Sequence, residues 1–314
     1  MKFKKPYFWN LKKPNFLSYL LQPFTLPLIL NNFLLNLKSN KKNKNLKSIC
    51  VGNIYLGGTG KTPTTIRLYE ILKNLKFKVS TAKKFYRSQS DENMILQKYS
   101  SFISAKSRSE IIKKAINDKY NVVVFDDGLQ DRSVSYDLKF VCFDSENFIG
   151  NGCLIPSGPL REKIDSLRKY DAVFLKNDTL ISNDHLNLIK KNNNQIEIFE
   201  TFINIENIND FDLKKDYLIF SGIGNHNSFK NILLKNKFKI KKEIIFSDHH
   251  DYSINEIKNI LSESENLNTS IVTTEKDYVK ISKIVTTNIK FIKIKINVKN
   301  EENLINFLKK KLND

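Results

Sequence analysis

The segment Gly57–Pro63, with sequence GGTGKTP, constrains the fold most, because it lies between an apolar run ending at Gly52 and a helical pattern beginning near Pro63. Glycines there let backbone N–H groups turn inward on a phosphate, and the following helix adds the positive end of its dipole. Lys61 can reach the β- and γ-phosphates, and the Thr62 hydroxyl can ligate magnesium. A strict G-x-x-x-x-G-K-[ST] loop has glycine at position 55, where this chain has Tyr55, so we expect a shortened or variant phosphate-binding loop. Its predicted phosphate-binding residues are Gly57, Gly58, Thr59, Gly60, Lys61 and Thr62.

From residue 48 onward, short apolar runs alternate with helical patterns, which predicts an α/β fold of two α/β/α lobes with mostly parallel sheets. The first lobe is expected to be P-loop NTPase-like. The strands are expected at 48–52, 78–82, 122–125, 138–143, 172–175, 196–203, 217–221, 240–246, 269–274 and 289–298. Helices are expected near 227–235, 253–264 and 301–312, and the pairs Ser107/Glu110 and Ser253/Glu256 have the spacing of capping boxes.

The domain boundaries follow from changes in this pattern. We expect residues 1–47 to form an N-terminal membrane-associated segment and residues 48–205 to form an ATP-binding, P-loop-like domain. Residues 206–215 lose periodicity and become polar, which predicts a linker, and 216–314 form a smaller C-terminal α/β domain.

The N-terminal segment combines lysines with long apolar side chains. Of the net charge of +19, +10 lies in residues 1–50, which contain ten Lys and no Asp, Glu or Arg. The apolar stretch is interrupted by Pro23, Pro27 and the pair Asn31-Asn32, so a full membrane span is not expected. We expect basic apolar helices at the membrane interface, over anionic headgroups; helices packed on the protein's own core are the alternative. The flanking lysines are Lys2, Lys4, Lys5, Lys12, Lys13, Lys38, Lys41, Lys42, Lys44 and Lys47.

Composition excludes several other classes. The three cysteines, Cys50, Cys142 and Cys153, are widely spaced and odd in number, so neither a disulfide framework nor a Cys-rich zinc site is expected, and a reducing cytoplasm fits best. Nucleic-acid binding is not expected, because no recognition motif accompanies the basic charge.

The apolar run Val122–Phe125 ends in Asp126 and Asp127. In nucleotide hydrolases and kinases with such a loop, a carboxylate at this position holds magnesium. Asp-Gly can also simply begin a turn. With the glycine-rich loop upstream, the pattern favours metal binding.

Five motifs follow one another in the order that they have in a known enzyme family: VGN…GGTGKTP at 51–63, DDGLQ at 126–130, PSGPLRE at 156–162, SDHH at 247–250 and TEKD at 274–277. The chain resembles the tetraacyldisaccharide 4′-kinases of lipid A synthesis over nearly its whole length. The resemblance implies transfer of the ATP γ-phosphoryl group to the 4′-hydroxyl of a tetraacyl disaccharide 1-phosphate. ATP and Mg²⁺ are the implied cofactors, the cytoplasmic face of the inner membrane is the implied location of a peripheral, monotopic enzyme, and no protein partner is required.

The resemblance also implies site residues. Asp91, in Ser-Asp-Glu-Asn at 90–93, is implied as the base that accepts the proton of the sugar hydroxyl, oriented by His249 of the other lobe across a cleft. Lys61 and Arg161 are implied to contact phosphate, and Thr62, Asp126, Asp127 and Glu162 to hold Mg²⁺. A solvated turn or a metal site at His249-His250 and a helix start at 161–162 are the alternatives.

The chain departs from the family pattern in places. The segment 83–93 lacks two glycines and part of a loop, G-D-E-P has become Ser-Asp-Glu-Asn, and Asp131 replaces a common histidine.

A different class of function uses the same loop: a membrane-attached nucleotide switch that acts on a protein partner. A switch needs no acceptor base, so Asp91 and His249 distinguish the two functions.

Overall fold

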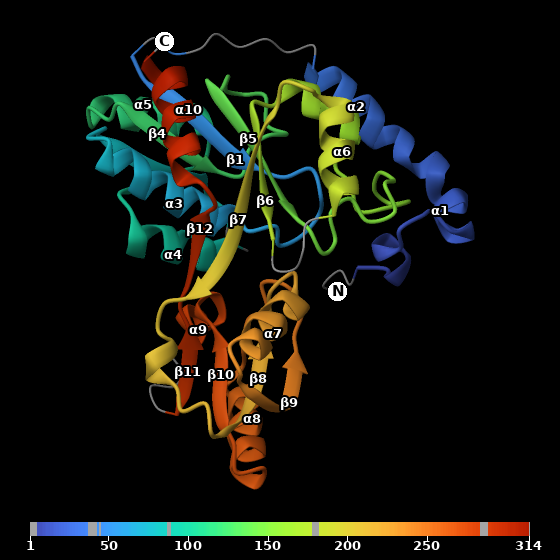
Figure 1. Cartoon of the computed structure of the whole chain (residues 1–314), viewed down its shortest axis with the longest axis vertical. Helices are drawn as coiled ribbons and strands as arrows, with labels where there is room; N and C mark the ends of the chain where they lie inside the picture. Colours follow the sequence, from blue (N-terminus) through green and yellow to red (C-terminus); the bar gives the residue numbers. More distant parts are fainter. Residues whose placement is uncertain are drawn as a thin grey trace. The chain divides into compact units, whose positions relative to one another are not determined.

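A computed structural model describes residues 5–36, 43, 45–86, 89–177, 182–282 and 288–313. The chain divides into two compact units, each with its own sheet (Figure 1). The large unit contains Lys5–Phe85, Tyr99–Phe202 and Asn297–Asp314, and the small unit contains Tyr86–Lys98 and Ile203–Ile296. Lys2, Lys4, Lys38, Lys41, Lys42 and Lys44 of the predicted basic flanks lie outside the described residues.

The large unit is built on an eight-stranded sheet in the order β12-β7-β6-β5-β1-β4-β2-β3. The strands from β7 to β3 in this order pair in parallel, as βαβ units require. Their bounds are β1 Lys47–Gly52, β2 Val79–Lys84, β3 Phe102–Ala105, β4 Val122–Asp126, β5 Leu138–Asp144, β6 Ala172–Lys176, β7 Glu197–Ile205 and β12 Ile294–Val298.

Helices cover both faces of this sheet. Alternate residues of β1 show this: Ile49 belongs to one apolar core and Cys50 to the other. The core around Ile49 includes side chains of α3 (Lys61–Asn74) and α10 (Glu301–Asn313), and the core around Cys50 includes side chains of α5 (Arg108–Asn117) and α6 (Asn183–Asn192). Burial on both faces explains why the strands are almost continuously apolar. The short helix η4 (Ile164–Lys169) completes this layer.

The small unit has a four-stranded parallel sheet in the order β11-β10-β8-β9. Its α7 packs on one face, and α8 and α9 on the other. The predicted capping box at Ser253 and Glu256 is present at the start of α8. The bounds are α4 Ser90–Tyr99, η5 Ile208–Asp210, β8 Asp216–Ser221, α7 His226–Lys235, β9 Lys239–Ile245, α8 Ile254–Asn266, β10 Ser270–Thr274, α9 Glu275–Ile281 and β11 Ile289–Ile292.

The α/β class with mostly parallel sheets is thus confirmed, but the last predicted strand was wrong. Residues 289–298 form two strands that belong to different sheets, β11 and β12. Lys293 separates them, and its backbone N–H donates to Asn207 Oδ1 at 2.8 Å. The short strand β3 was not predicted, because its four residues give too brief a pattern.

The division into units also differs from the predicted domains. Residues 206–215 are no linker, because Phe211 is buried against Tyr217 and Phe238 in the core of the small unit. The C-terminal α10 belongs to the large unit, since Leu304, Leu308 and Leu312 lie in its core. The helix α4, predicted in the first lobe, belongs to the small unit.

The N-terminal segment comprises η1 (Tyr7–Asn10), α1 (Phe16–Leu21), η2 (Gln22–Thr25) and α2 (Leu26–Asn36). It is part of the large unit, because Trp9 is fully buried and its Nε1 donates to the carbonyl of Pro156 at 3.0 Å. Leu28 and Ile29 pack on the cluster formed by Tyr55, Leu154 and Leu160. Among the described residues, no helix has the length and hydropathy that a membrane crossing requires.

The assignment of α10 to the large unit predicts a stability effect. Leu308→Ala should lower the free energy of unfolding by about 2–5 kcal/mol, because it leaves a cavity in the core. The neighbouring exposed position provides the control, since Lys309→Ala should change stability by less than about 0.5 kcal/mol. Urea denaturation followed by circular dichroism measures both, and equal midpoints for the two variants would contradict the assignment.

Candidate active site

The phosphate-binding loop joins β1 to α3 in the large unit. Gly60 caps α3 with φ of 83°, and Gly57 has φ of 137°, so both glycines occupy backbone conformations that side chains disfavour. Asn53 is fully buried, and its Nδ2 donates to the carbonyl of Gly57 and to Thr59 Oγ1, each at 3.1 Å. The helix α3 begins at Lys61, directly after this loop. The free backbone N–H groups of its first turn therefore lie next to the loop, as an anion site at a helix N-terminus requires.

Thr62 meets the end of β4. Its Oγ1 donates to Asp126 Oδ2 at 2.8 Å, and Lys83 Nζ at the end of β2 lies 3.2 Å from the same oxygen. Asp126 and Lys83 are both buried, so each charge is compensated by the other. A hydroxyl and a carboxylate oxygen side by side are the donor types that Mg²⁺ prefers when substrate phosphates supply further ligands.

Asp127 follows β4 with φ of 67°, which turns its side chain toward two cations. Its Oδ2 lies 3.9 Å from Lys61 Nζ and 3.6 Å from Arg161 Nη1. Burial opposes ionisation, but Lys61 and Arg161, with Lys83 and Arg108 behind them, hold the pKa of Asp127 below its ordinary value. Both contacts are longer than close ion pairs, so Lys61 and Arg161 can move to a phosphate.

Glu162 is buried beside this site. Its Oε1 accepts hydrogen bonds from Gln130 Nε2 at 2.8 Å and from the Tyr170 hydroxyl at 2.9 Å. Gln130 Nε2 also donates to the carbonyl of Asn53 at 3.0 Å, and so connects Glu162 to the strand before the loop.

The donor set fits Mg²⁺ through Thr62 and Asp126. Among the residues that the structure describes, no three His, Cys, Asp or Glu side chains converge on one point. Asp126, Asp127 and Glu162 therefore do not form a closed carboxylate cage, which Mg²⁺ does not need when phosphates and water complete its octahedron. The roles of Asp127 and Glu162 as ligands stay predictions.

Asp131, where the family often has histidine, forms an ion pair with the buried guanidinium of Arg108. Arg108 Nη2 also donates to the carbonyl of Asp127 at 2.8 Å. The altered residue thus takes part in holding the loop after β4. Burial opposes ionisation of Asp131, but hydrogen bonds from Ser133 and the charge of Arg108 lower its pKa.

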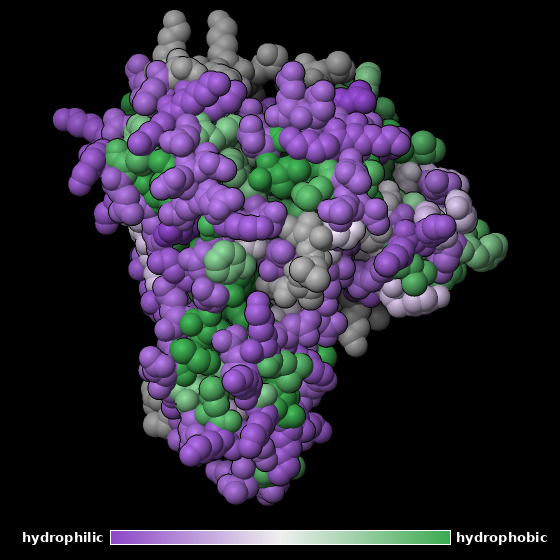
Figure 2. All heavy atoms as spheres, viewed as in Figure 1, coloured by the Kyte–Doolittle hydropathy of each residue, from purple (hydrophilic) through white to green (hydrophobic). Residues whose placement is uncertain are grey.

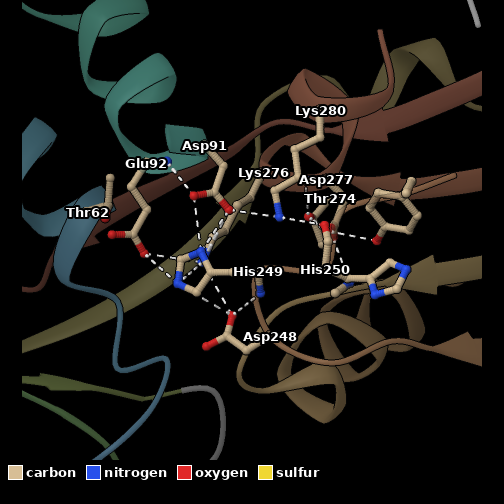
Figure 3. Close-up of polar contacts among 12 residues, drawn as sticks. Thr62, Asp91, Glu92, Asp248, His249, His250, Thr274, Lys276, Asp277 and Lys280 are labelled. Atoms are coloured by element: carbon tan, nitrogen blue, oxygen red, sulfur yellow. Dashed lines mark hydrogen bonds and ion pairs between the residues drawn. The ribbon is translucent and has the colours of Figure 1, made fainter. Parts of the chain in front are cut away.

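The small unit brings Asp91 and His249 together (Figure 3). Asp91, in the first turn of α4, is 1% exposed, and His249 Nδ1 lies 3.0 Å from its Oδ2 and 3.1 Å from its Oδ1. The pair was predicted to link two lobes, but α4 belongs to the same unit as His249. The reason is a set of ion pairs from α4 to α9: Asp91–Lys280, Glu92–Lys276 and Lys98–Glu275.

Two lysines on one face of α9 compensate the charge of Asp91. Lys280 Nζ lies 3.0 Å and Lys276 Nζ 3.9 Å from Asp91 Oδ2. Burial would raise the pKa of Asp91, but the hydrogen bond from His249 and the positive charges of Lys276, protonated His249 and Lys280 lower it to about 2. Asp91 is therefore an ionised acceptor at every physiological pH.

The turn that carries His249 is held by Asp277. The Asp277 carboxylate accepts hydrogen bonds from the backbone N–H of Gly222 at 3.1 Å and from the Tyr252 hydroxyl at 2.9 Å. The backbone N–H of His249 in turn donates to the carbonyl of Gly222 at 3.0 Å, and His249 has φ of 54°. This scaffold fixes the position of the imidazole.

Four charged residues of these sites were not predicted as site residues from the sequence: Lys83, Arg108, Lys276 and Lys280. Lys276 lies within the motif TEKD, so its place in the motif was the available signal, and Lys280 lies one helical turn further. Lys83 and Arg108 gave no signal, because lysine is common throughout the chain and Arg108 lies in an ordinary amphipathic helix.

Sequence and structure comparisons match the chain to known proteins over nearly its whole length. A family model described as "Tetraacyldisaccharide-1-P 4'-kinase" matches residues 17–313. A tetraacyldisaccharide 4′-kinase of Pelagibacter ubique is 42% identical over 98% of both chains, and one of Rickettsia akari is 32% identical over 95% of this chain and 94% of its own. The fold matches a crystal structure of LpxK from Aquifex aeolicus in complex with ATP, with a TM-score of 0.70, 22% identity, and coverage of 94% of this chain and 99% of that one.

The charge balance at Asp91 predicts a titration effect. Lys280→Met should raise the pKa of Asp91 above about 2, because the nearest ammonium group is removed from a buried carboxylate. Carboxyl ¹³C shifts followed against pH measure this, with the signal assigned from Asp91→Asn. Lys242→Met is the matched control, since Lys242 contacts Glu263 instead, and an unshifted Asp91 titration in Lys280→Met would contradict the account.

Proposed function

The chain belongs to the tetraacyldisaccharide-1-P 4′-kinase family, and we propose that its large unit holds MgATP while Asp91 of its small unit activates the acceptor hydroxyl. It is an ATP-dependent kinase that phosphorylates the 4′-hydroxyl of tetraacyldisaccharide 1-phosphate in lipid A synthesis. The observation that carries the proposed residue roles is the buried, ionised carboxylate of Asp91 hydrogen-bonded to His249. A nucleotide switch needs no such acceptor base.

In the large unit, the backbone N–H groups of the loop 57–60 and the start of α3 bind the phosphates. Lys61 and Arg161 exchange their loose contacts with Asp127 for the γ-phosphate, where charge develops during transfer. Thr62 and Asp126 would hold Mg²⁺, with Asp127 and Glu162 as the further candidates. A bound Mg²⁺ would supply positive charge that neutralises the ATP phosphates.

In the small unit, Asp91 accepts a hydrogen bond from the 4′-hydroxyl and orients it. The proton moves to Asp91 as the new O–P bond forms and the bond from the γ-phosphorus to the bridging oxygen of ADP breaks. A pKa of about 2 makes Asp91 a weak base. That suffices for a loose transition state, in which the hydroxyl needs orientation more than early deprotonation.

The N-terminal segment supports a proposal for membrane attachment at the cytoplasmic face. Its apolar side chains are exposed, among them Phe16 at 78% and Phe24 at 67%, and Figure 2 shows apolar side chains along its outer edge. Such an exposed set beside Lys12 and Lys13 fits an anionic lipid surface. Asn32 Nδ2 of α2 donates to the carbonyl of Arg161 at 2.9 Å, so the same segment supports a proposed phosphate ligand.

The kinase proposal predicts the effect of site variants. The purified chain in detergent, with MgATP and tetraacyldisaccharide 1-phosphate and no other protein, should form the 4′-phosphorylated lipid. Asp91→Asn and Lys61→Met should each lower kcat/KM at least about 100-fold, because one removes the hydroxyl acceptor and the other a phosphate ligand. Thin-layer separation of radiolabelled lipid measures the product.

Matched variants control for stability. Asp216→Asn alters an exposed aspartate of the small unit, and Lys73→Met an exposed lysine of α3, and both should keep full activity. Lipid phosphorylation by Asp91→Asn at the rate of the unaltered protein would refute the role of Asp91. ATP hydrolysis without lipid product, stimulated by a partner protein, would favour the switch.

The membrane proposal predicts a loss of vesicle binding. Changing Phe16, Phe24 and Phe33 together to serine should weaken co-sedimentation with anionic phospholipid vesicles at least about 10-fold, because three exposed rings no longer enter the bilayer interface. Phe202→Ser, at an exposed phenylalanine of β7, is the control. Unchanged binding of the triple variant would contradict the proposal.

A further inference from the structure

Lys276 is the centre of a charged cluster that surrounds the imidazole of His249 (Figure 3). Its ammonium nitrogen lies 3.2 Å from Glu92 Oε1, 3.5 Å from Asp248 Oδ1 and 3.3 Å from His249 Nε2. An ammonium group has three donors and no acceptor, and here it has three acceptors at hydrogen-bonding distance. The pKa of Lys276 is raised by these carboxylates against the effect of burial, so the group keeps its charge.

The distances point to one assignment of the ring proton of His249. Because an ammonium group can only donate, the contact with Lys276 is a hydrogen bond if Nε2 presents its lone pair. Nδ1 then carries the single ring proton, and its neighbour at 3.0–3.1 Å is the carboxylate of Asp91, which can only accept. Every donor in the chain Lys276, His249, Asp91 thus meets an acceptor.

Three carboxylates and two lysines surround the imidazole of His249. Glu92 Oε1 lies 3.8 Å and Asp248 Oδ1 3.9 Å from Nε2, besides Asp91 on the other side of the ring. Lys280 from α9 donates to Asp91 and to the carbonyl of His250. Of the adjoining groups, His250 pairs with Glu256, and Asp277 accepts from Tyr252 and Thr274.

We propose that Lys276 is a positioning residue that holds His249 neutral with its proton on Nδ1, so that Asp91 is the group that accepts the proton of the lipid hydroxyl. The inference rests on the proposed function for its consequence, and on geometry alone for the protonation state. An imidazole with a free Nε2 lone pair would itself be a competing base.

Nitrogen-15 NMR of the full chain labelled at histidine tests the protonation state directly. The chain has four histidines, so the His249 signals can be assigned from His249→Gln. At neutral pH the unaltered protein should show a protonated Nδ1 and an unprotonated Nε2. Lys276→Met should change the Nε2 signal, because that nitrogen then loses its ammonium donor. Lys276→Arg should restore the original pattern.

Kinetics test the consequence. Lys276→Met should lower kcat for the lipid roughly 10- to 100-fold with an unchanged KM for ATP, because the imidazole beside Asp91 is no longer held in place. Lys276→Arg should recover much of the rate. Lys242→Met, a matched change at a lysine that pairs with Glu263, should alter neither the spectrum nor the rate.

Two results would overturn the proposal: an imidazolium or an Nε2-protonated His249 in the unaltered protein at neutral pH, or unchanged His249 signals in Lys276→Met. The spectrum of the unaltered protein tests the assignment even if the variant does not fold. If the lipid were not phosphorylated at all, the proposed function would fail while the protonation state of His249 would still be measured.

Discussion

A carboxylate buried as deeply as Asp91 can remain ionised only if cations and hydrogen-bond donors replace the water it has lost. In the small unit this requirement is met by His249, Lys276 and Lys280, and it explains more than the pKa of one group. The lysines that compensate Asp91 and Glu92 lie on α9, so the same ion pairs that keep the proposed base charged attach α4 to the small unit. The same interactions therefore stabilise the small unit and form the proposed acceptor site.

The large unit also contains a buried carboxylate, and different residues compensate its charge. Asp126 is fully buried at the end of β4. Lys83, near the end of β2, supplies the compensating charge, and Thr62, at the start of α3, supplies a hydrogen-bond donor. Asp127, one residue later, faces Lys61 and Arg161 through looser contacts. The close pair maintains the fold, whereas the looser contacts leave two cations for a phosphate. Parallel strands place all these groups at one edge of the sheet, where α/β folds bind ligands.

The sequence predicted the features that follow from local pattern. The phosphate-binding loop, the Asp-tipped strand and the α/β class were visible because glycine spacing and apolar periodicity specify them directly. The pairing of Asp91 with His249 came from the resemblance to a family, and the structure adds that both lie in one unit. Periodicity could not show that the run 289–298 serves two sheets, because both halves are equally apolar and only Lys293 marks the change. Nor could it show that Phe211 is a core residue within a polar stretch. Lys276 lies within the motif TEKD, but the motif alone did not single it out among so many lysines, and its contacts with His249 and Glu92 do.

We propose that the large unit binds the nucleotide and that Asp91 activates the hydroxyl. Single-turnover transfer to the lipid by Asp91→Asn, measured beside calorimetric binding of MgATP, separates these two functions. Asp91→Asn should bind the nucleotide with the affinity of the unaltered protein and form almost no phosphorylated lipid. Lost nucleotide binding, or transfer at an unaltered rate, would contradict the proposal.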